Sequence, residues 1–134
     1  MDSIKKELFR RIRFDYSPID DIDDYLKLGG SLNIVNELDE NMLIVAVKHE
    51  NTRIVRYLLE QGLNKNIIDS EKRSIYYISA LNYNADMFDL LLKYKVPIRD
   101  YQLRKVIELL KSRKGQNKYL KYWDELLIEL KEML

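Results

Sequence analysis

The sequence predicts an all-α fold, a solenoid of about four helix-turn-helix units whose first and last units are modified. A short pattern of apolar residues followed by glycine returns every 33 residues, so that Gly29, Gly62 and Lys95 occupy equivalent places. The apolar residues before these places have the spacing of one face of a helix. Because a unit of this length cannot bury its apolar face alone, neighbouring units are expected to stack into a continuous core.

Length and composition limit the classes of function. A chain of 134 residues, of which 46% are hydrophobic and 34% charged, fits one folded domain. The N-terminus lacks the apolar region of a signal peptide, and no apolar run reaches the ~20 residues of a bilayer-spanning helix. The chain has no cysteine, which excludes disulfides and thiolate metal sites and fits a reducing compartment. A cytoplasmic location without membrane contact is therefore expected.

The first unit combines an amphipathic helix at 3–14, with Ser3 as a possible cap, and a second helix that opens at Ser17-Pro18. Proline suits the first helical position because its φ is already helical and its missing N–H would have no partner there. Gly29 follows the last apolar residue of this second helix. A glycine at this place can adopt the left-handed conformation that ends a helix.

The two central units begin with segments rich in Val, Ile and Tyr, which alone would favour strands. The 33-residue register favours helices instead, at roughly 41–49 and 74–82, with Asn41 and Ser74 as N-caps. Ala46 and Ser79 are the small residues expected where two helices approach closely. Asn51 and Asn84 are expected near the turns into the partner helices.

The partner helices carry the apolar stripes of the central units. The stripes are Ile54, Val55, Leu58 and Leu59 in one helix and Met87, Phe88, Leu91 and Leu92 in the next. Gly62 is expected to be left-handed at the end of the first of these helices. Lys95 lacks the freedom of glycine, so the second is expected to end differently.

Two further helices, at Leu103–Arg113 and Lys118–Leu134, are expected around a turn at 114–117. The last is longer than its counterparts and carries Trp123 and several leucines on one side. The domain then divides into an N-terminal cap pair at 1–36, repeats at 37–69 and 70–102, and a C-terminal cap pair at 103–134.

With these features the pattern resembles the ankyrin repeat. The stretch from Asn41 to Asp69 carries most of the resemblance, because Val-Arg-Tyr-Leu-Leu-Glu-Gln-Gly-Leu-Asn is similar to the family's second helix and its ending. The family's Thr-Pro-Leu-His opening is absent, and Asp39, Lys72, Glu50 and Tyr83 stand where the family has glycine. Loss of that threonine and histidine removes a network that ties adjacent loops, so a less rigid stack is expected.

No catalytic constellation is found in the sequence. His49 is the single histidine and belongs to no HExxH or comparable motif, so a surface position is expected for it. No nucleophilic triad and no glycine-rich phosphate loop is present. The chain is therefore expected to have no enzymatic activity, no cofactor and no metal. Among its tyrosines, Tyr76 and Tyr25 are expected in helix seams and Tyr83 on the surface.

The resemblance implies a binding surface formed by loop tips and first helices, and hence protein–protein recognition. The residues that it implies are Glu37, Leu38 and Glu40 in one loop, Ser70, Glu71 and Arg73 in the next, and Lys48, His49, Asn82 and Tyr83 on the helices. A monomer that acts by occupying its partner, as an inhibitor, an immunity (antitoxin-like) protein or an adaptor, is the leading interpretation.

The charge pattern leaves a question about the partner. Acidic residues gather at Asp20–Asp24 and at Glu37–Glu40, which favours a basic partner. Basic residues gather in the first helix and near Lys111–Lys121, and nucleic-acid binding through these ends is the alternative. With a net charge of +1 and the two basic clusters at opposite ends of a stack, nucleic acid is the less favoured partner.

Overall fold

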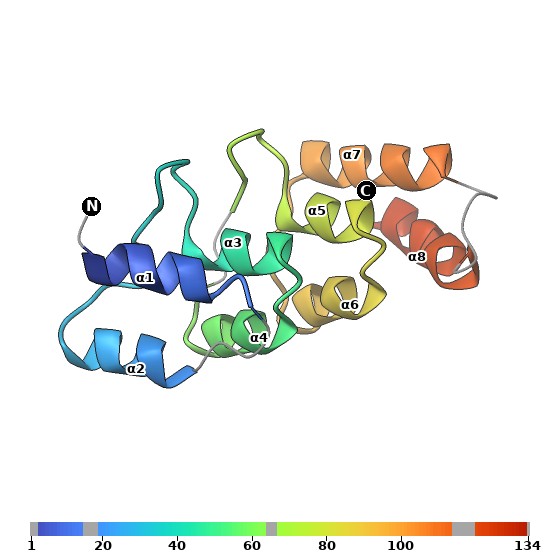
Figure 1. Cartoon of the computed structure of the whole chain (residues 1–134). Helices are drawn as coiled ribbons and strands as arrows, with labels where there is room; N and C mark the ends of the chain where they lie inside the picture. Colours follow the sequence, from blue (N-terminus) through green and yellow to red (C-terminus); the bar gives the residue numbers. More distant parts are fainter. Residues whose placement is uncertain (1–2, 15–18, 64–66, 114–119, 134) are drawn as a thin grey trace.

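The computed structural model describes residues 3–14, 19–63, 67–113 and 120–133, and in these ranges it is all-helical (Figure 1). Its eight helices form consecutive pairs, with the first helix of each pair in one layer and the second in the other. The only β contacts among these residues are the isolated bridges Val35–Asn41 and Ile68–Ser74. The helices are α1 Ser3–Arg11, α2 Ile19–Lys27, α3 Met42–Lys48, α4 Thr52–Glu60, α5 Ile75–Leu81, α6 Ala85–Lys93, α7 Asp100–Ser112 and α8 Leu120–Glu132.

The segments that resembled strands are helices, as the repeat register predicted. Asn41 and Ser74 are the N-caps of α3 and α5, and their side-chain oxygens accept hydrogen bonds from the amides of Ile44 (3.0 Å) and Tyr77 (3.1 Å). Ala46 and Ser79 are both fully buried, as expected for residues at close helix contacts. The repeat register thus outweighs the strand propensity of Val and Ile.

Asn51 joins the first two helix pairs. Its side-chain oxygen accepts from the Ile54 amide (3.3 Å) and so caps α4. Its amide group donates to the carbonyl oxygens of Ile12 (3.0 Å) and Phe14 (2.8 Å), beyond the end of α1. A fully buried side chain therefore satisfies backbone groups at the start of α4 and in the turn after α1 at once. Asn84 likewise caps α6, since its side-chain oxygen accepts from the Met87 amide (3.0 Å).

The helix ends contain one correction. Gly29 and Gly62 are left-handed, with φ of 91° and 90°, as predicted. Lys95, which was expected to end its helix differently, is left-handed as well, with φ of 54°. The Val96 amide then donates to the Leu91 carbonyl (3.1 Å), as the Leu63 amide does to the Leu58 carbonyl (3.0 Å). This bond and the burial of Val96 offset the roughly 1–2 kcal/mol that a left-handed non-glycine residue costs.

Four other non-glycine residues adopt the left-handed conformation, at the four places where the sequence lacked the glycines of its resemblance. They are Asp39, Glu50, Lys72 and Tyr83. Hydrogen bonds hold two of these turns: the Asn36 side chain accepts from the amides of Leu38 and Glu40, and Asp69 accepts from those of Glu71 and Arg73. Side-chain acceptors in the loops therefore take over part of the role of glycine.

We expect Gly62→Ala to lower the free energy of unfolding by about 1 kcal/mol, because Gly62 is left-handed. An added Cβ would meet no atom within 4 Å, so the cost comes from the backbone conformation alone. Urea unfolding measures it. Gln61→Ala is the control, since Gln61 has an ordinary φ of −80° and should change stability by less than about 0.5 kcal/mol. A neutral Gly62→Ala variant would contradict the assigned conformation.

Tyrosine–carboxylate hydrogen bonds connect the second helices of successive pairs. Tyr57 donates to Asp23, Tyr94 to Glu60 (2.9 Å) and Tyr122 to Asp89 (2.6 Å), so each bond spans 33 or 34 residues. For Tyr57, burial and then the bond to Asp23 raise the pKa to about 12. The hydroxyl therefore remains a donor at neutral pH. These bonds repeat with the period of the solenoid and join α2, α4, α6 and α8.

Tyr57→Phe is expected to cost about 1 kcal/mol at neutral pH, the usual net value of a hydrogen bond. The folded-state pKa of Tyr57 lies above its ordinary value of 10, so the benefit is full below pH 10 and is lost as the pH rises towards 12. The stability difference between parent and variant should narrow over that range. A difference that grows with pH would contradict the assignment of Tyr57 as the donor.

The end pairs follow the prediction with shifted boundaries. Helix α1 ends at Arg11 rather than at 14, and α7 begins at Asp100 rather than at 103. The earlier start of α7 reflects a cap at Arg99, whose amide donates to the Gln102 side chain (2.9 Å). Phe88 of α6 lies between Tyr76 and Trp123 and so connects the last two helix pairs. The predicted helix start at Ser17-Pro18 and the turn at 114–117 lie outside the described residues.

Candidate functional site: the inner face

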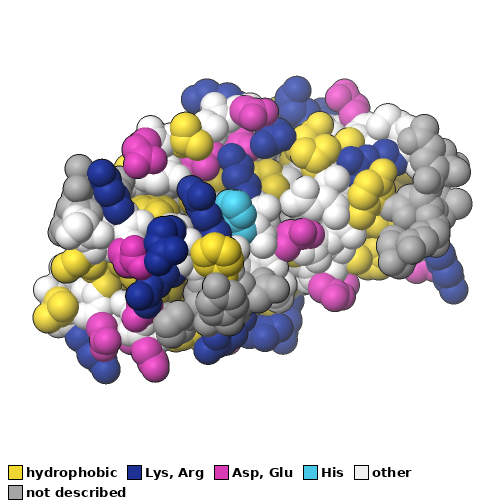
Figure 2. Space-filling view, viewed as in Figure 1, with side chains coloured by type: hydrophobic (Ala, Val, Ile, Leu, Met, Phe, Trp, Pro, Cys, Tyr) yellow, Lys and Arg dark blue, Asp and Glu magenta, His cyan; other side chains and the backbone are white. Residues whose placement is uncertain are grey.

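One face of the solenoid presents the loops and the first helices together. We call it the inner face and define it as loops 36–40 and 69–73 with the exposed sides of α1, α3, α5 and α7. The loops project beyond the first helices in Figure 1. In the same view, Figure 2 shows the single histidine near the middle of this surface, with Lys and Arg side chains gathered on one side of it. His49 is exposed, as the sequence predicted.

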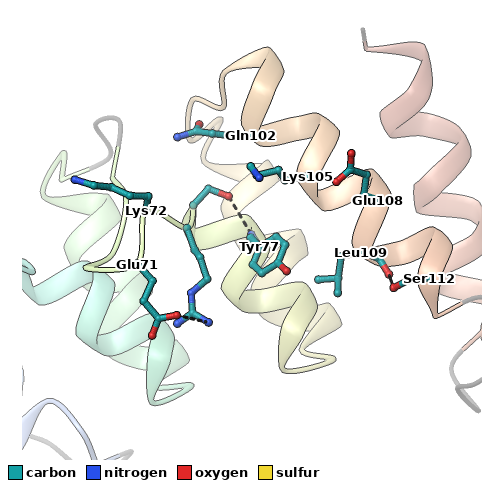
Figure 3. A pocket seen from close by; sticks show the side chains of 10 residues that line it. Glu71, Lys72, Tyr77, Gln102, Lys105, Glu108, Leu109 and Ser112 are labelled. Carbon is teal, nitrogen blue, oxygen red and sulfur yellow. Dashed lines mark hydrogen bonds and ion pairs between the residues drawn. The ribbon is translucent and has the colours of Figure 1, made fainter.

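A groove of about 430 Å³ lies in the C-terminal half of the inner face, between loop 69–73, α5 and α7 (Figure 3). Tyr77 and Leu109, both half-buried, give it an apolar part. Charged side chains of both signs surround them. The groove is lined by Glu71, Lys72, Arg73, Ser74, Tyr77, Gln102, Lys105, Glu108, Leu109 and Ser112.

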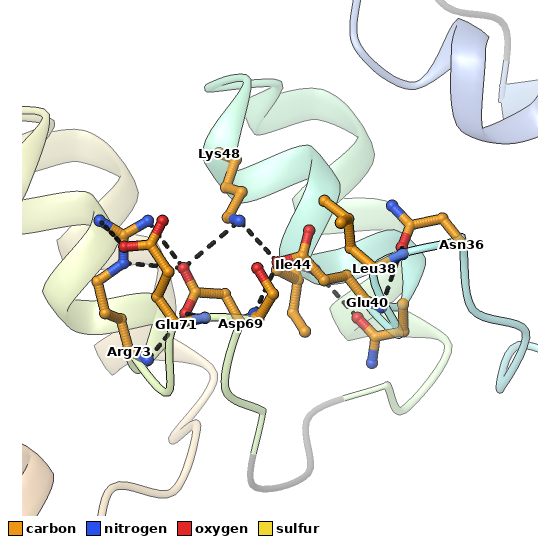
Figure 4. A network of polar contacts seen from close by, with 10 residues as sticks. Asn36, Leu38, Glu40, Ile44, Lys48, Asp69, Glu71 and Arg73 are labelled. Carbon is orange, nitrogen blue, oxygen red and sulfur yellow. Dashed lines mark hydrogen bonds and ion pairs between the residues drawn. The ribbon is translucent and has the colours of Figure 1, made fainter.

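Beside the groove, an ionic network links the two loops of the inner face (Figure 4). The carboxylate of Glu40, only 2% exposed, accepts from Lys48 Nζ (2.6 Å) and from the Ser70 amide (2.9 Å). Lys48 Nζ also lies 3.4 Å from Asp69, which pairs with Arg73 at 2.9 Å. The network therefore crosses from one repeat to the next. It supplies ties between adjacent loops that the sequence had led us to regard as lost.

Asp69 remains charged in this network. Burial, the largest single effect, would raise the pKa of its carboxyl group, but hydrogen bonds from the Arg73 amide and guanidinium and from the Glu71 amide act in the opposite direction. The net result is a pKa below the ordinary value of 3.8. The loop is thus held by a carboxylate that is ionised at neutral pH.

The structure separates the ten predicted site residues into three groups. Exposed on the inner face or next to it are Glu37, Leu38, His49, Ser70, Glu71, Asn82 and Tyr83. Half-buried, with their charges paired, are Lys48 and Arg73. Glu40 is buried and engaged by Lys48 and Ser70, which corrects its expected role as an open contact. Glu71 and Arg73 meet at the groove, whereas Tyr83 lies under the Arg113 guanidinium, 4.1 Å from the ring centre.

Several groove residues were not among the predicted site residues. Tyr77 belonged only to the helix expected at 74–82, and Lys105, Glu108 and Leu109 belonged to the expected C-terminal cap pair. Their spacing on α7 could have revealed them, because positions 105, 108, 109 and 112 form one side of a helix. The missing information was that this side of α7 continues the face formed by α3 and α5.

The acidic run at Asp20–Asp24 does not belong to the inner face. It lies on α2, in the second-helix layer. Asp21 pairs with Arg11 at 2.5 Å, and Asp23 accepts the hydrogen bond of Tyr57. With Glu40 also engaged internally, the expected acidic surface for a basic partner is not assembled there.

Two classes of site lack a candidate among the residues that the structure describes. Among the described residues, no three His, Asp or Glu side chains come close enough together to hold a metal ion. Over the same ranges, no helix has the length and apolar character that crossing a bilayer requires.

Comparison with known proteins identifies the repeat. The model of the family described as ankyrin repeats, in three copies, matches residues 18–102. A fowlpox virus (strain NVSL) protein named as an ankyrin repeat protein is 30% identical to this chain over 80 residues. That match covers 60% of the chain but only 19% of the viral protein, so the chain corresponds to a small part of its relative.

Proposed function

The chain belongs to the ankyrin-repeat family, and on that premise we propose that it binds another protein through the inner face, with the groove at Tyr77 as the central contact. Ankyrin repeats are protein–protein interaction modules. The observation that carries the proposal is the groove itself, where a half-buried tyrosine and a leucine lie among charges of both signs. This combination suits a protein segment that offers an apolar side chain flanked by polar ones.

Composition supports the choice of this groove over other parts of the surface. Tyrosine and arginine are the residues that, with tryptophan, dominate binding energy at protein interfaces. Tyr77 and Arg73 both line the groove, and Lys105 and Glu108 can form the polar rim that excludes water around such a centre. A segment bound here would also contact loop 69–73, which the network through Asp69 fixes.

We propose further that the protein acts by occupying its partner, as an inhibitor, an immunity-type protein or an adaptor. The fixed loops support this form of action. Because Glu40, Lys48 and Asp69 hold the loops of successive repeats together, little conformational entropy would be lost on binding. A preformed surface of this kind favours stable occupation of a partner. We also propose that the chain is a monomer until it binds.

A capture experiment with matched tyrosine variants tests the proposal. The partner is first captured with the parent protein. Tyr77→Ala should lower the affinity for this partner by about thirtyfold or more, which corresponds to the ~2 kcal/mol of an interface hot spot. Tyr101→Ala is the control, since Tyr101 is likewise a tyrosine on a first helix but is exposed and does not line the groove. Lys105→Ala and its neighbour Arg104→Ala form a second pair on the same helix. Equal binding by Tyr77→Ala and parent would exclude the groove.

A further inference from the structure

The N-terminal half of the inner face holds a second hollow of about 190 Å³, apart from the Tyr77 groove. It lies between α1, the turn after it, loop 36–40 and α3. Its lining includes three cationic side chains, Lys6, Arg10 and Arg13, and a single carboxylate, Glu37. Phe9 and Val45, both buried, also contribute to it.

Neighbouring carboxylates compensate this positive charge only in part. Glu7 pairs with Arg10 (2.6 Å) and Arg11 (2.9 Å), and Glu40 pairs with Lys48. Within the described ranges, no carboxylate lies at ion-pair distance from Lys6 or Arg13. The hollow therefore carries an excess of positive charge, although the whole chain has a net charge of only +1.

The positive field extends beyond the hollow to α3. The pKa of His49 is lowered, first by its partial burial and then by the positive charges of Arg13 and Lys48. The charge of Arg13 therefore acts on His49 at the end of α3 as well as in the hollow. In Figure 2, Lys and Arg side chains gather to the left of the histidine.

We propose that this basic hollow receives an acidic segment of the partner protein, a run of Asp and Glu side chains that pairs with Lys6 and Arg13. The inference rests on the proposed function and adds the charge of the partner. It reverses the sign expected from the sequence, because Asp20–Asp24 lie on α2 and Glu40 is paired with Lys48. In the hollow, the three cations of α1 and the turn after it outnumber the single carboxylate of Glu37.

The rest of the inner face favours a protein over a nucleic acid. A nucleic-acid strand carries a negative charge at every nucleotide and needs a positive track along its whole path. Beyond the hollow, Glu71 and Glu108 line the groove together with Arg73 and Lys105. A strand that continued along the face would meet these carboxylates. A protein segment whose acidic stretch is followed by a mixed polar and apolar stretch matches both halves of the inner face, the hollow and the groove.

The test uses a fluorescent peptide of alternating Asp and Glu, an uncharged peptide of alternating Asn and Gln, and an oligothymidylate of equal charge. Binding is measured for the parent, for Lys6→Glu/Arg13→Glu, and for Arg56→Glu/Lys93→Glu. The last is the matched control, with the same change in net charge at exposed residues of α4 and α6. Circular dichroism verifies that both variants remain folded.

The acidic peptide should bind the parent, the Asn/Gln peptide should not, and reversal in the hollow should weaken binding at least about tenfold relative to reversal on α4 and α6. The effect should be largest near 0.01 M salt, where the Debye length is about 30 Å, and small near 1 M, where it is about 3 Å.

Three results would overturn the inference: no binding of the acidic peptide, equal weakening by both double reversals, or displacement of the peptide by oligothymidylate at equal concentration. The peptide assay needs no natural partner. If the acidic peptide does not bind but the natural partner is captured through Tyr77, only the proposal of an acidic segment is refuted. A positive peptide result together with equal partner capture by Tyr77→Ala and the parent would instead refute the groove.

Discussion

Lys48→Met is expected to lower the free energy of unfolding by about 3 kcal/mol or more, measured by urea unfolding at neutral pH. The variant keeps the aliphatic length of the side chain but removes the cation between Glu40 and Asp69. Both carboxylates are almost fully buried, with side-chain exposures of 2% and 0%. The free energy lost when a buried charge has no partner is much larger than the net stabilisation that the intact ion pair provides. Removal of one partner therefore has a large effect on stability.

Lys93→Met is the control for this variant, because Lys93 is exposed on α6 and should tolerate the change within about 0.5 kcal/mol. Acid provides a second check. The pKa of Asp69 is depressed in the folded protein, so its contribution exists above the ordinary value of 3.8 and is lost as the pH falls below it. Protonated Asp69 no longer offers Lys48 a negative charge, so the stability gap between parent and Lys48→Met should narrow at low pH. A constant gap would show that the network does not act through charge.

Phe88→Ala is expected to cost about 3–5 kcal/mol, the range for removal of a buried aromatic ring. Phe88 is only 1% exposed, with ring centres of Tyr76 and Trp123 at 5.1 and 5.9 Å. The ring thus joins α5 and α8 through α6. Because a solenoid unit contacts only its neighbours, this loss should loosen the last helix pair before the rest.

The chain has a single tryptophan, so fluorescence of Trp123 reports on the last helix pair while circular dichroism reports on the whole chain. In Phe88→Ala the fluorescence transition should occur at lower denaturant concentration than the transition by circular dichroism. Phe14→Ala is the control, since the Phe14 side chain is 42% exposed. A loss below about 1 kcal/mol in Phe88→Ala would mean that α8 is not held by this contact.

Most of the fold could be predicted because a repeat multiplies weak signals. The caps at Asn41 and Ser74 depend on residues three apart, and the apolar stripe of α4 depends on the helical period, so both are local. The left-handed Lys95 could not be predicted. Its conformation is disfavoured locally and is maintained by contacts of Val96 that only the folded chain supplies.

The candidate site was harder to predict because charge in a sequence does not reveal its partners. Glu40 was expected on the surface, yet Lys48 and the Ser70 amide engage it across 8 and 30 residues. The acidic run on α2 was visible, but the bond of Asp23 to Tyr57 spans 34 residues. Likewise Tyr77 and Lys105 share a groove because α5 and α7 pack together, a contact between separate units of the repeat.

Site-specific photo-crosslinking tests the claim that the inner face binds the partner most directly. A photoreactive residue is placed in the native cell at Lys105 or His49 on the inner face, or at Arg56 or Lys93 on α4 and α6. We predict that the two inner positions yield the same protein adduct and that the two positions on α4 and α6 do not. Adducts formed from Arg56 and Lys93, with none from Lys105 and His49, would contradict the assignment of the inner face.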